Sequence, residues 1–429
     1  MSAKWKKKAQ PELILDRYKR ISSETEDNRI QFSGFEVFDL DPQLNRMIDY
    51  GETFNFHTKK TFRDRAIRAC IKSKKITKEQ YIKELNKEIS LYKNKETQDF
   101  TLVTSISIDS SIPLTRIKLE NTTIRFYKAG LPKKYQERFK HNSQWDSLDK
   151  HNSPLPENYS VVTIRVKGKS VEDAAEAALN HLDYVRGVVG YLVNPQNFFS
   201  PFGPSGIKPL NRIMLGGMHT LHKTNGKLAI PDSFWFETNY KQIPPYKFKD
   251  ETKEKIKKNI NYILSKIESM PPNDKETLIP ALTRYARALD DQDRNVIIQK
   301  LWALLESLTA KGENNCDKLV KRCSYLYSES EYVAQILEGI RDYRNQYIHA
   351  GLSEEEIDSH CYQLQKVFRT LIGFYIGKAN TFESIEEANQ FLDFPQKVED
   401  IEEEETKTER RLKLLREAKR FRTGPPKKQ

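Results

Sequence analysis

The chain has 429 residues, of which 37% are hydrophobic and 31% charged, and its formal net charge is +12. No apolar run is long enough to span a bilayer, so the composition excludes an integral membrane protein and favours a soluble one with two or three domains. The first twenty residues lack the apolar segment of a secretory signal, which predicts a cytoplasmic protein. The charge is compatible with a polyanionic partner, although many basic proteins bind no nucleic acid.

The sequence predicts neither a metal site nor a cofactor. Four cysteines are scattered without a CxxC pair, which indicates reduced thiols: Cys70, Cys316, Cys323 and Cys361. His219 and His222 are three apart in an extended run, so their side chains are expected on opposite faces of a strand rather than on one metal. The glycines form neither a P-loop nor a dinucleotide fingerprint.

The first third of the chain changes from a helical to an extended pattern. Residues 1–60 have only weak periodicity, which does not place them. Thr77 and Gln80 form a capping box, after which apolar residues recur at helical spacing. Residues 100–108 favour a strand, and residues 117–127 favour two short strands. A sheet is therefore predicted to begin near residue 100.

The middle of the chain continues this mixed pattern. Residues 130–159 are rich in proline and turn residues and predict a long loop with at most one short helix. Residues 161–166 favour a strand, and Ser170 begins a helix whose alanine-rich face suits close packing on a sheet. Residues 224–227, TNGK, predict a hairpin turn. We interpret residues 1–245 as an N-terminal mixed α/β domain.

After Pro244 and Pro245 the apolar residues recur with the helical period of 3.6 residues, and this pattern continues almost to Lys378. We therefore assign residues 246–395 to an all-α helical bundle, which makes the whole chain α+β. Residues 396–429 contain an acidic block and then a basic run, with too few apolar residues to pack. They predict a charged, flexible and partly helical tail.

Residues 331–351, EYVAQILEGIRDYRNQYIHAG, are the most informative stretch. A stripe of apolar residues marks one side of the predicted helix, and Arg344 lies in the middle of that stripe. A guanidinium there must be paired with a carboxylate, such as that of Glu338 or Glu306, or meet an anionic ligand. His349 lies in the last turn, where the helix dipole favours imidazolium and the nearby arginines oppose it.

The end of this helix is also predicted. Gly351 suits the left-handed conformation that ends a helix, and Ser353 with Glu356 forms a capping box for the next one.

The string Arg344-Asn345-Gln346-Tyr347-Ile348-His349 resembles the motif of the HEPN family. That motif is an arginine, four to six intervening residues and a histidine, often with Asn, Asp or His directly after the arginine. HEPN proteins are helical bundles, and many are metal-independent ribonucleases. Predicted helices at 301–308 and 318–326 precede the motif helix, and a long apolar helix follows it, an order similar to that of the ApeA-like branch.

The resemblance implies an endoribonuclease in which a ribose 2′-hydroxyl attacks the adjacent phosphate. His349 would exchange a proton with that hydroxyl or with the leaving 5′-oxygen. Arg344 would stabilise charge on the phosphorane, and Asn345 would orient the ring or the phosphate. Arg341 and Tyr347 are candidate supporting residues. Arg344 and His349 are five residues apart, so on a straight helix their side chains point about 140° away from each other. They cannot both face one phosphate unless the last turn of the helix is distorted or two chains share the site. The family's arrangement is the second, with two motif helices meeting across a homodimer.

The resemblance further implies a prokaryotic toxin or antiphage defence role, such as growth arrest on infection, with RNA as substrate and a phage-derived trigger sensed by the N-terminal domain. Alternatives stay open. One is a non-catalytic HEPN-like dimer that binds RNA or a protein, and another is an arginine with a purely structural role. A DNA-binding regulator is disfavoured because no helix-turn-helix pattern is present.

Overall fold

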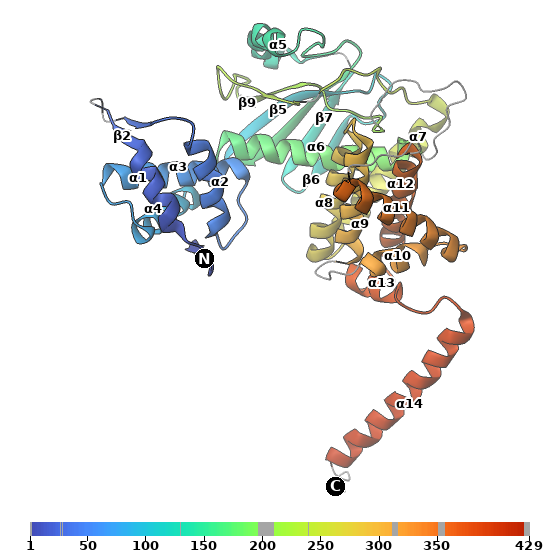
Figure 1. Cartoon of the computed structure of the whole chain (residues 1–429). Helices are drawn as coiled ribbons and strands as arrows, with labels where there is room; N and C mark the ends of the chain where they lie inside the picture. Colours follow the sequence, from blue (N-terminus) through green and yellow to red (C-terminus); the bar gives the residue numbers. More distant parts are fainter. Residues whose placement is uncertain are drawn as a thin grey trace, which may run out of the picture. The chain divides into compact units, whose positions relative to one another are not determined.

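The computed structural model describes residues 2–25, 27, 29–128, 130–195, 210–238, 240–310, 316–350 and 357–423, with residues 316 and 348–350 described by their backbone alone. The chain divides into two compact units (Figure 1). Unit 1 contains Met1–Leu182 and Leu215–Lys249, and unit 2 contains Asp183–Met214 and Asp250–Gln429. The mixed fold class and the presence of a helical C-terminal region are confirmed.

Unit 1 begins with a helical cluster, which the weak periodicity of residues 1–60 did not reveal. Its elements are β1 (Lys4–Trp5), α1 (Pro11–Ile21), β2 (Ser22–Glu24), β3 (Ile30–Phe32), α2 (Val37–Met47), β4 (Ile48–Asp49), α3 (Phe56–Lys72) and α4 (Lys78–Lys93). The predicted start of α4 is confirmed, because the Thr77 hydroxyl accepts the Gln80 N–H at 3.2 Å. Arg63 is buried in this cluster and donates two hydrogen bonds to Asp41.

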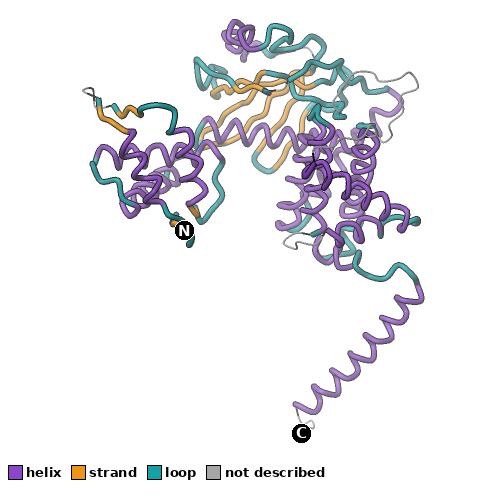
Figure 2. Tube along the Cα trace, viewed as in Figure 1, coloured by secondary structure: helices purple, strands orange, loops and turns teal. Residues whose placement is uncertain are grey.

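The rest of unit 1 contains an antiparallel sheet with the strand order β10-β9-β5-β8-β7-β6 (Figure 2). Its strands are β5 (Gln98–Ile106), β6 (Arg116–Leu119), β7 (Thr122–Tyr127), β8 (Ser160–Gly168), β9 (Met218–Lys223) and β10 (Trp235–Phe236). The strands predicted near residues 100–108, 117–127 and 161–166 are therefore confirmed. The predicted turn after β9 is present, with Gly226 at φ 87°.

The first half of α6 (Val171–Val193) lies across one face of this sheet (Figure 1). Ala174, Ala175 and Ala178 are fully buried there, so the small side chains allow the close approach that was predicted. Apolar residues that alternate along the strands, such as Leu102 and Ile164, are also fully buried. Polar residues at the intervening positions of the strands point to the opposite face of the sheet.

The predicted long loop at 130–159 contains more helix than expected. A 3₁₀ helix, η1 (Lys133–His141), continues into α5 (Asn142–Leu148). Tertiary contacts hold this segment: the buried Arg138 donates to the backbone oxygens of Val103 and Met218 at 2.8 and 2.6 Å. Trp145 packs so closely on Gly217 that a Cβ there would overlap its ring. Such contacts are long-range, so local sequence propensity did not show them.

Unit 2 is a bundle of helices. They are α7 (Asp250–Glu268), α8 (Pro272–Leu289), α9 (Arg294–Thr309), α10 (Cys316–Ser324), α11 (Ser330–Ala350), α12 (Ile357–Gly377) and α13 (Ile385–Phe391). Helix α9 packs against α8, α10, α11 and α12, and its Leu301, Trp302 and Leu305 are fully buried. Tyr285 of α8 stacks on Phe368 of α12 with ring centroids 4.4 Å apart.

The segment Asp183–Met214 belongs to unit 2, whereas it was predicted to lie in the first domain, residues 1–245. Ion pairs between residues distant in sequence explain the difference. Arg186 of α6 donates to Asp290 at 2.6 Å, and Arg287 of α8 donates to Asp183 at 2.6 Å. The second half of α6 is thereby bound to α8 and the residue that follows it.

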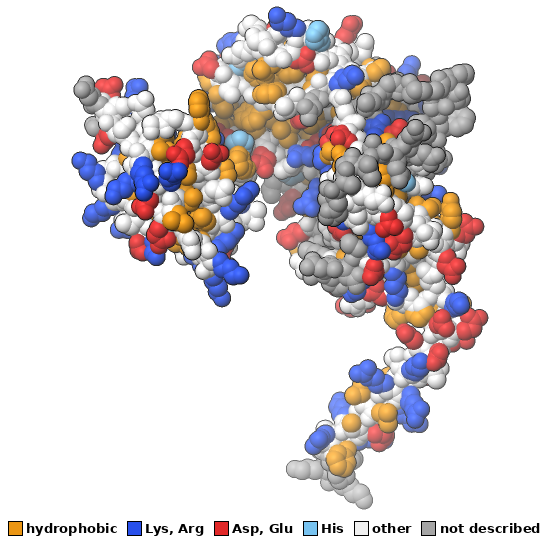
Figure 3. Space-filling view, viewed as in Figure 1, with side chains coloured by type: hydrophobic (Ala, Val, Ile, Leu, Met, Phe, Trp, Pro, Cys, Tyr) orange, Lys and Arg blue, Asp and Glu red, His pale blue; other side chains and the backbone are white. Residues whose placement is uncertain are grey.

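The chain's last helix is α14 (Val398–Thr423), which has no buried residue. Acidic side chains gather near its start and basic ones further along (Figure 3). The helical and charged character predicted for the tail is confirmed. In the described part of the chain, no helix combines the length and apolar character needed to cross a membrane.

Candidate functional site

The predicted site residues lie on the C-terminal half of α11. The helix is amphipathic: Leu337 and Ile340 are fully buried against the bundle, while Glu331 and Tyr332 are exposed. Tyr343 is also buried, at the position just before Arg344, and its hydroxyl donates to Asn295 of α9 at 2.6 Å. This contact fixes the turn of α11 that carries the motif.

Arg344 is partly buried, with 21% of its side chain exposed. Its Nη1 donates to Oε1 of Glu306 at 3.4 Å, and its Nη2 donates to Oδ1 of Asn345 at 3.3 Å. Both hydrogen bonds are long compared with the usual 2.7–3.2 Å. Nε of Arg344 is buried without a hydrogen-bond partner among the described residues. Within the described part of the chain, the guanidinium therefore has donor capacity that no partner uses.

Glu306 is one of the two carboxylate partners expected for Arg344, and it is the one that the structure brings close. Its Oε1 also accepts from Nε1 of Trp302 at 2.8 Å, so the carboxylate is held from two sides. The Arg344 guanidinium lies over the Trp302 ring, 5.4 Å from the centroid, in cation–π geometry. Trp302 was not predicted as a site residue. Its position four residues before Glu306 could have indicated it, because residues at this spacing lie side by side on one face of a helix.

The other predicted site residues differ in their surroundings. Asn345 turns its side-chain oxygen toward Arg344, so these two motif residues are together. Arg341 is bound to two carboxylates, Asp317 at 2.8 Å and Glu338 at 2.6 Å. Tyr347 is half-buried. Arg341 is thus engaged as an ordinary surface ion pair, which weakens its role as a supporting residue.

His349 has only its backbone described, in the last turn of α11. The predicted helix end at Gly351 and the capping box of Ser353 and Glu356 lie outside the described residues. The geometry of the candidate site therefore rests on Arg344, Asn345 and the residues around them.

His360 of α12 also lies near the motif turn, and sequence analysis did not identify it. Its ring centroid is 5.2 Å from that of Tyr343, which precedes Arg344. No local pattern marks it, because its position near the motif turn depends on a contact between α12 and Tyr343 of α11. His360 therefore adds a titratable group close to the motif turn.

Two buried arginines of unit 2 are paired more completely. Arg186 has 1% of its side chain exposed, and its three nitrogens donate to Asp183 at 2.5 Å, Asp290 at 2.6 Å and the Ile213 oxygen at 2.8 Å. Arg322 is buried and binds both carboxylate oxygens of Asp393, at 2.5 and 2.7 Å. Compared with these two, Arg344 has longer hydrogen bonds. Its Nε without a partner is not unique, because Nε of the buried Arg138 in unit 1 also has none among the described residues.

The remaining reactive side chains are in structural environments. Cys70, Cys323 and Cys361 are buried and free, and burial raises the pKa of each thiol to about 12, which disfavours the thiolate. His219 bonds to Thr104 and Glu237, and His222 bonds to Thr220 and Gly226. Within the described ranges no cluster of three or more His, Cys, Asp or Glu could hold a metal ion.

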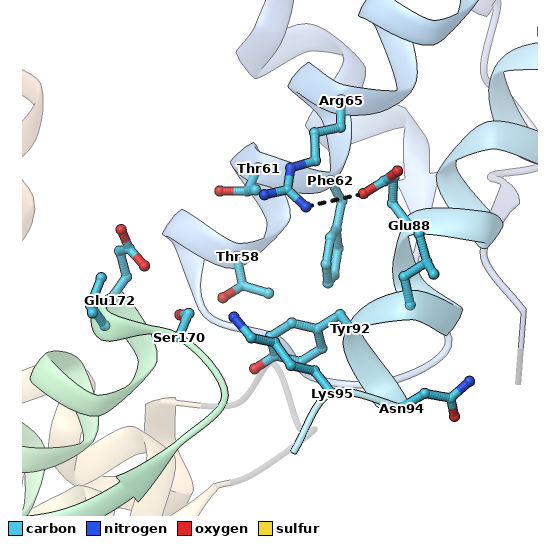
Figure 4. A pocket seen from close by; sticks show the side chains of 12 residues that line it. Thr58, Thr61, Phe62, Arg65, Glu88, Tyr92, Asn94, Lys95, Ser170 and Glu172 are labelled. Carbon is cyan, nitrogen blue, oxygen red and sulfur yellow. Dashed lines mark hydrogen bonds and ion pairs between the residues drawn. The ribbon is translucent and has the colours of Figure 1, made fainter. Parts of the chain in front are cut away.

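Unit 1 contains a cavity of about 600 Å³ between α3, α4 and the start of α6 (Figure 4). Arg65 lines it but donates to Glu88 at 3.4 Å, and Lys95 and Glu172 also line it, so its positive and negative charges balance. The cavity includes none of the predicted site residues. Its balanced lining does not select a class of ligand.

No protein-family model matches the chain, and the searches of curated proteins and of solved structures give no match either.

Proposed function

We propose that the chain is a metal-independent endoribonuclease of HEPN type whose site is centred on Arg344, Asn345 and His349. The observation that carries this proposal is the incomplete pairing of Arg344. The guanidinium has 21% of its side chain exposed, two long hydrogen bonds and an Nε without a partner among the described residues, so it retains donors for a further anion, such as a phosphate. The placement of Asn345 beside it and of His349 one turn later adds the other components.

The reaction needs a proton acceptor, a proton donor and a positive group. A base takes the proton of the 2′-hydroxyl, the 2′-oxygen forms a bond to phosphorus, and the bond from phosphorus to the 5′-oxygen breaks as that oxygen gains a proton. The products are a 2′,3′-cyclic phosphate and a 5′-hydroxyl. His349 exchanges one of these protons, and Arg344 stabilises the negative charge of the phosphorane. Asn345 orients the phosphate or the ring.

The proposed active form is a homodimer or higher homo-oligomer in which Arg344 and His349 from different copies share one cleft. The support is geometric: five residues along a straight helix correspond to about 140° of rotation. We further propose a cytoplasmic toxin or antiphage defence role with a phage-derived trigger.

The experiment is cleavage of an end-labelled RNA in EDTA by the parent chain and by His349→Ala and Arg344→Ala variants. His349→Ala is expected to lose about 10²–10⁴ in rate while RNA affinity is kept, because a proton-transfer group contributes to the transition state. Arg344→Ala is expected to lose both rate and affinity. A mixture of the two variants should recover part of the activity if two copies share a cleft.

The matched control is His57→Ala, which removes an exposed histidine of α3 in unit 1 and should cleave as the parent does. Strict dependence on magnesium or manganese would contradict the mechanism. If His349→Ala were as active as the parent, the ribonuclease proposal would be replaced by the second candidate, a non-catalytic RNA- or protein-binding dimer. The contacts of Arg344 with Glu306 and Trp302 are the ones that the other alternative, a purely structural arginine, would also make.

A further inference from the structure

The face of the sheet opposite α6 carries a group of cationic side chains on three neighbouring strands. Arg116 of β6 lies directly opposite Arg125 of β7, and Arg125 lies opposite Thr163 of β8. Arg165 is two residues further along β8, opposite both Thr123 and Thr101. Since residues two apart share a face, all three arginines project to the same side. We call this surface the sheet-face site.

The sheet-face site is concave. Its three arginines line a cavity of about 400 Å³ together with Lys134, Tyr127 and Tyr135. Threonines of the central strands, Thr101, Thr123 and Thr163, also line it and alternate with the arginines across the strands. Short hydroxyl side chains at the centre leave room for a ligand and offer donors to it. Cavities of this size hold ligands of nucleotide dimensions.

The wall formed by Lys134 and Tyr135 is fixed by the turn after β9. Gly226 has φ 87°, and a Cβ there would lie 2.4 Å from the Lys134 oxygen, so only glycine allows η1 to approach this closely. The Tyr135 ring also packs edge-on against His222, with centroids 5.1 Å apart. The cationic wall is therefore positioned by the fold rather than by a flexible loop.

The charges of this surface are not balanced. Asp99 is the single carboxylate among the residues lining the cavity, and it lies 3.4 Å from Arg165. Across the described part of the chain, neither Arg116 nor Arg125 has a carboxylate within ion-pair distance. Like charges directly opposite each other destabilise a sheet. The unbalanced Arg116–Arg125 pair is therefore a cost to the fold that a bound anion would remove.

We infer that the sheet-face site binds a single-stranded nucleic acid, with Arg116, Arg125 and Arg165 on successive phosphates and Tyr127 against a base. Arginines and hydroxyls are the usual partners of phosphate oxygens, and tyrosine rings offer stacking surfaces to unpaired bases. The inference concerns unit 1 and is independent of the ribonuclease proposal.

The test is fluorescence anisotropy of a labelled single-stranded DNA 10-mer with the full chain, across a series of salt concentrations. DNA lacks the 2′-hydroxyl, so the probe survives whether or not the chain cleaves RNA, and the two proposals can fail separately. The double variant Arg116→Gln/Arg125→Gln should weaken binding at least about tenfold and reduce the salt slope by about 1.4, which is 0.7 for each lost phosphate contact. Tyr127→Leu should weaken binding without changing the slope.

The matched control removes the same charge elsewhere: Arg410→Gln/Arg411→Gln on the fully exposed α14. This variant should change affinity less than twofold. Equal losses in the two double variants would show general charge attraction and overturn the inference, as would unchanged affinity in Arg116→Gln/Arg125→Gln. Binding of inorganic phosphate without binding of the oligonucleotide would also overturn it. The sheet-face variant should melt no lower than the parent, because it removes a repulsive pair.

Discussion

Arg186 and Arg344 lie in the same helical unit and show two different uses of a guanidinium. Arg186 is buried and donates hydrogen bonds to Asp183, Asp290 and a backbone oxygen at 2.5–2.8 Å. Arg344 is partly exposed, holds Glu306 and Asn345 at 3.3–3.4 Å and leaves Nε unpartnered. The first arrangement secures the second half of α6 to α8, whereas the second is the one for which we propose a ligand.

If Arg344 has the proposed role, burial alone does not distinguish a ligand-binding arginine from a structural one. A saturated arginine is costly to remove, because its carboxylates are left buried and unpaired. An unsaturated one contributes less to folding, because its donors are already poorly satisfied. We therefore expect the length of an arginine's hydrogen bonds to separate the two roles better than depth does, since the buried, structural Arg138 also has an Nε without a partner among the described residues.

The largest expected effect is on stability. Arg186→Met should lower the free energy of unfolding of unit 2 by about 3–5 kcal/mol, because Asp183 and Asp290 lose their shared partner. Arg344→Met keeps an apolar stem beside Trp302 and should cost about 1 kcal/mol or less. Urea denaturation followed by far-ultraviolet circular dichroism measures both variants.

The two variants are matched in chemistry, so each is the control for the other. Equal losses of several kcal/mol would mean that Arg344 is also a structural residue. In that case the ribonuclease proposal would lose the observation that carries it. A small loss in Arg344→Met together with a large one in Arg186→Met would support the distinction.

A smaller effect is expected at Glu306, the carboxylate that competes with a ligand for Arg344. Glu306→Gln keeps an acceptor for Trp302 but removes the negative charge. If Arg344 binds phosphate, RNA affinity should rise about two- to fivefold, the size of a partly exposed ion pair. RNA affinity is measured by fluorescence anisotropy for chains with and without Glu306→Gln. Both chains also carry His349→Ala, so that they should not cleave the RNA.

The control for Glu306→Gln is Glu338→Gln, which removes a carboxylate from the same helix as Arg344, where it pairs with Arg341 instead. This variant should not alter RNA affinity by more than the general change in charge does. Equal gains in both variants would mean that Glu306 does not act through Arg344.

Local patterns predicted much of the fold correctly. Thr77 with Gln80 marked the start of α4, and alternating residues marked β5 and β8, because capping and strand alternation are determined by neighbouring residues. The assignment of Asp183–Met214 to the helical unit could not be predicted. It depends on ion pairs between α6 and residues 287–290, about a hundred positions away, for which a sequence shows no spacing rule.

In the candidate site, too, features that depend on neighbouring residues were predicted, and features that depend on contacts between distant residues were not. The position of Arg344 on a core-facing stripe identified it, because helical periodicity shows which side chains share a face. Glu306 was offered only as one of two possible carboxylate partners, and its helix is a different one. The ring of Trp302 beneath the guanidinium and the bond from Tyr343 to Asn295 depend on how α9 and α11 pack. The sheet-face site was not found at all, because it depends on the register of three strands.

The smallest effect concerns pH and the pair Arg322–Asp393, which is saturated like that of Arg186. The Arg322 guanidinium, bound to both carboxylate oxygens, holds the pKa of Asp393 below its ordinary value. A carboxyl whose pKa is lowered on folding stabilises the protein above the pKa of the unfolded chain and loses this contribution as pH falls through the folded pKa. The loss should therefore begin near pH 4 and grow below it.

Asp393→Asn removes this titration, so the stability gap between parent and variant should be present at pH 7 and close as pH falls below about 4. Because a third of the Asp393 side chain is exposed, the part of the stability difference that disappears at low pH should be only about 0.5 kcal/mol. Asp400→Asn on the exposed α14 is the control and should leave the pH profile of the parent unchanged. A gap that stays constant from pH 7 to pH 3 would mean that Arg322 is held by the Thr309 oxygen and by packing instead of by the carboxylate charge. The ion pair with Asp393 would then not explain the difference between Arg322 and Arg344.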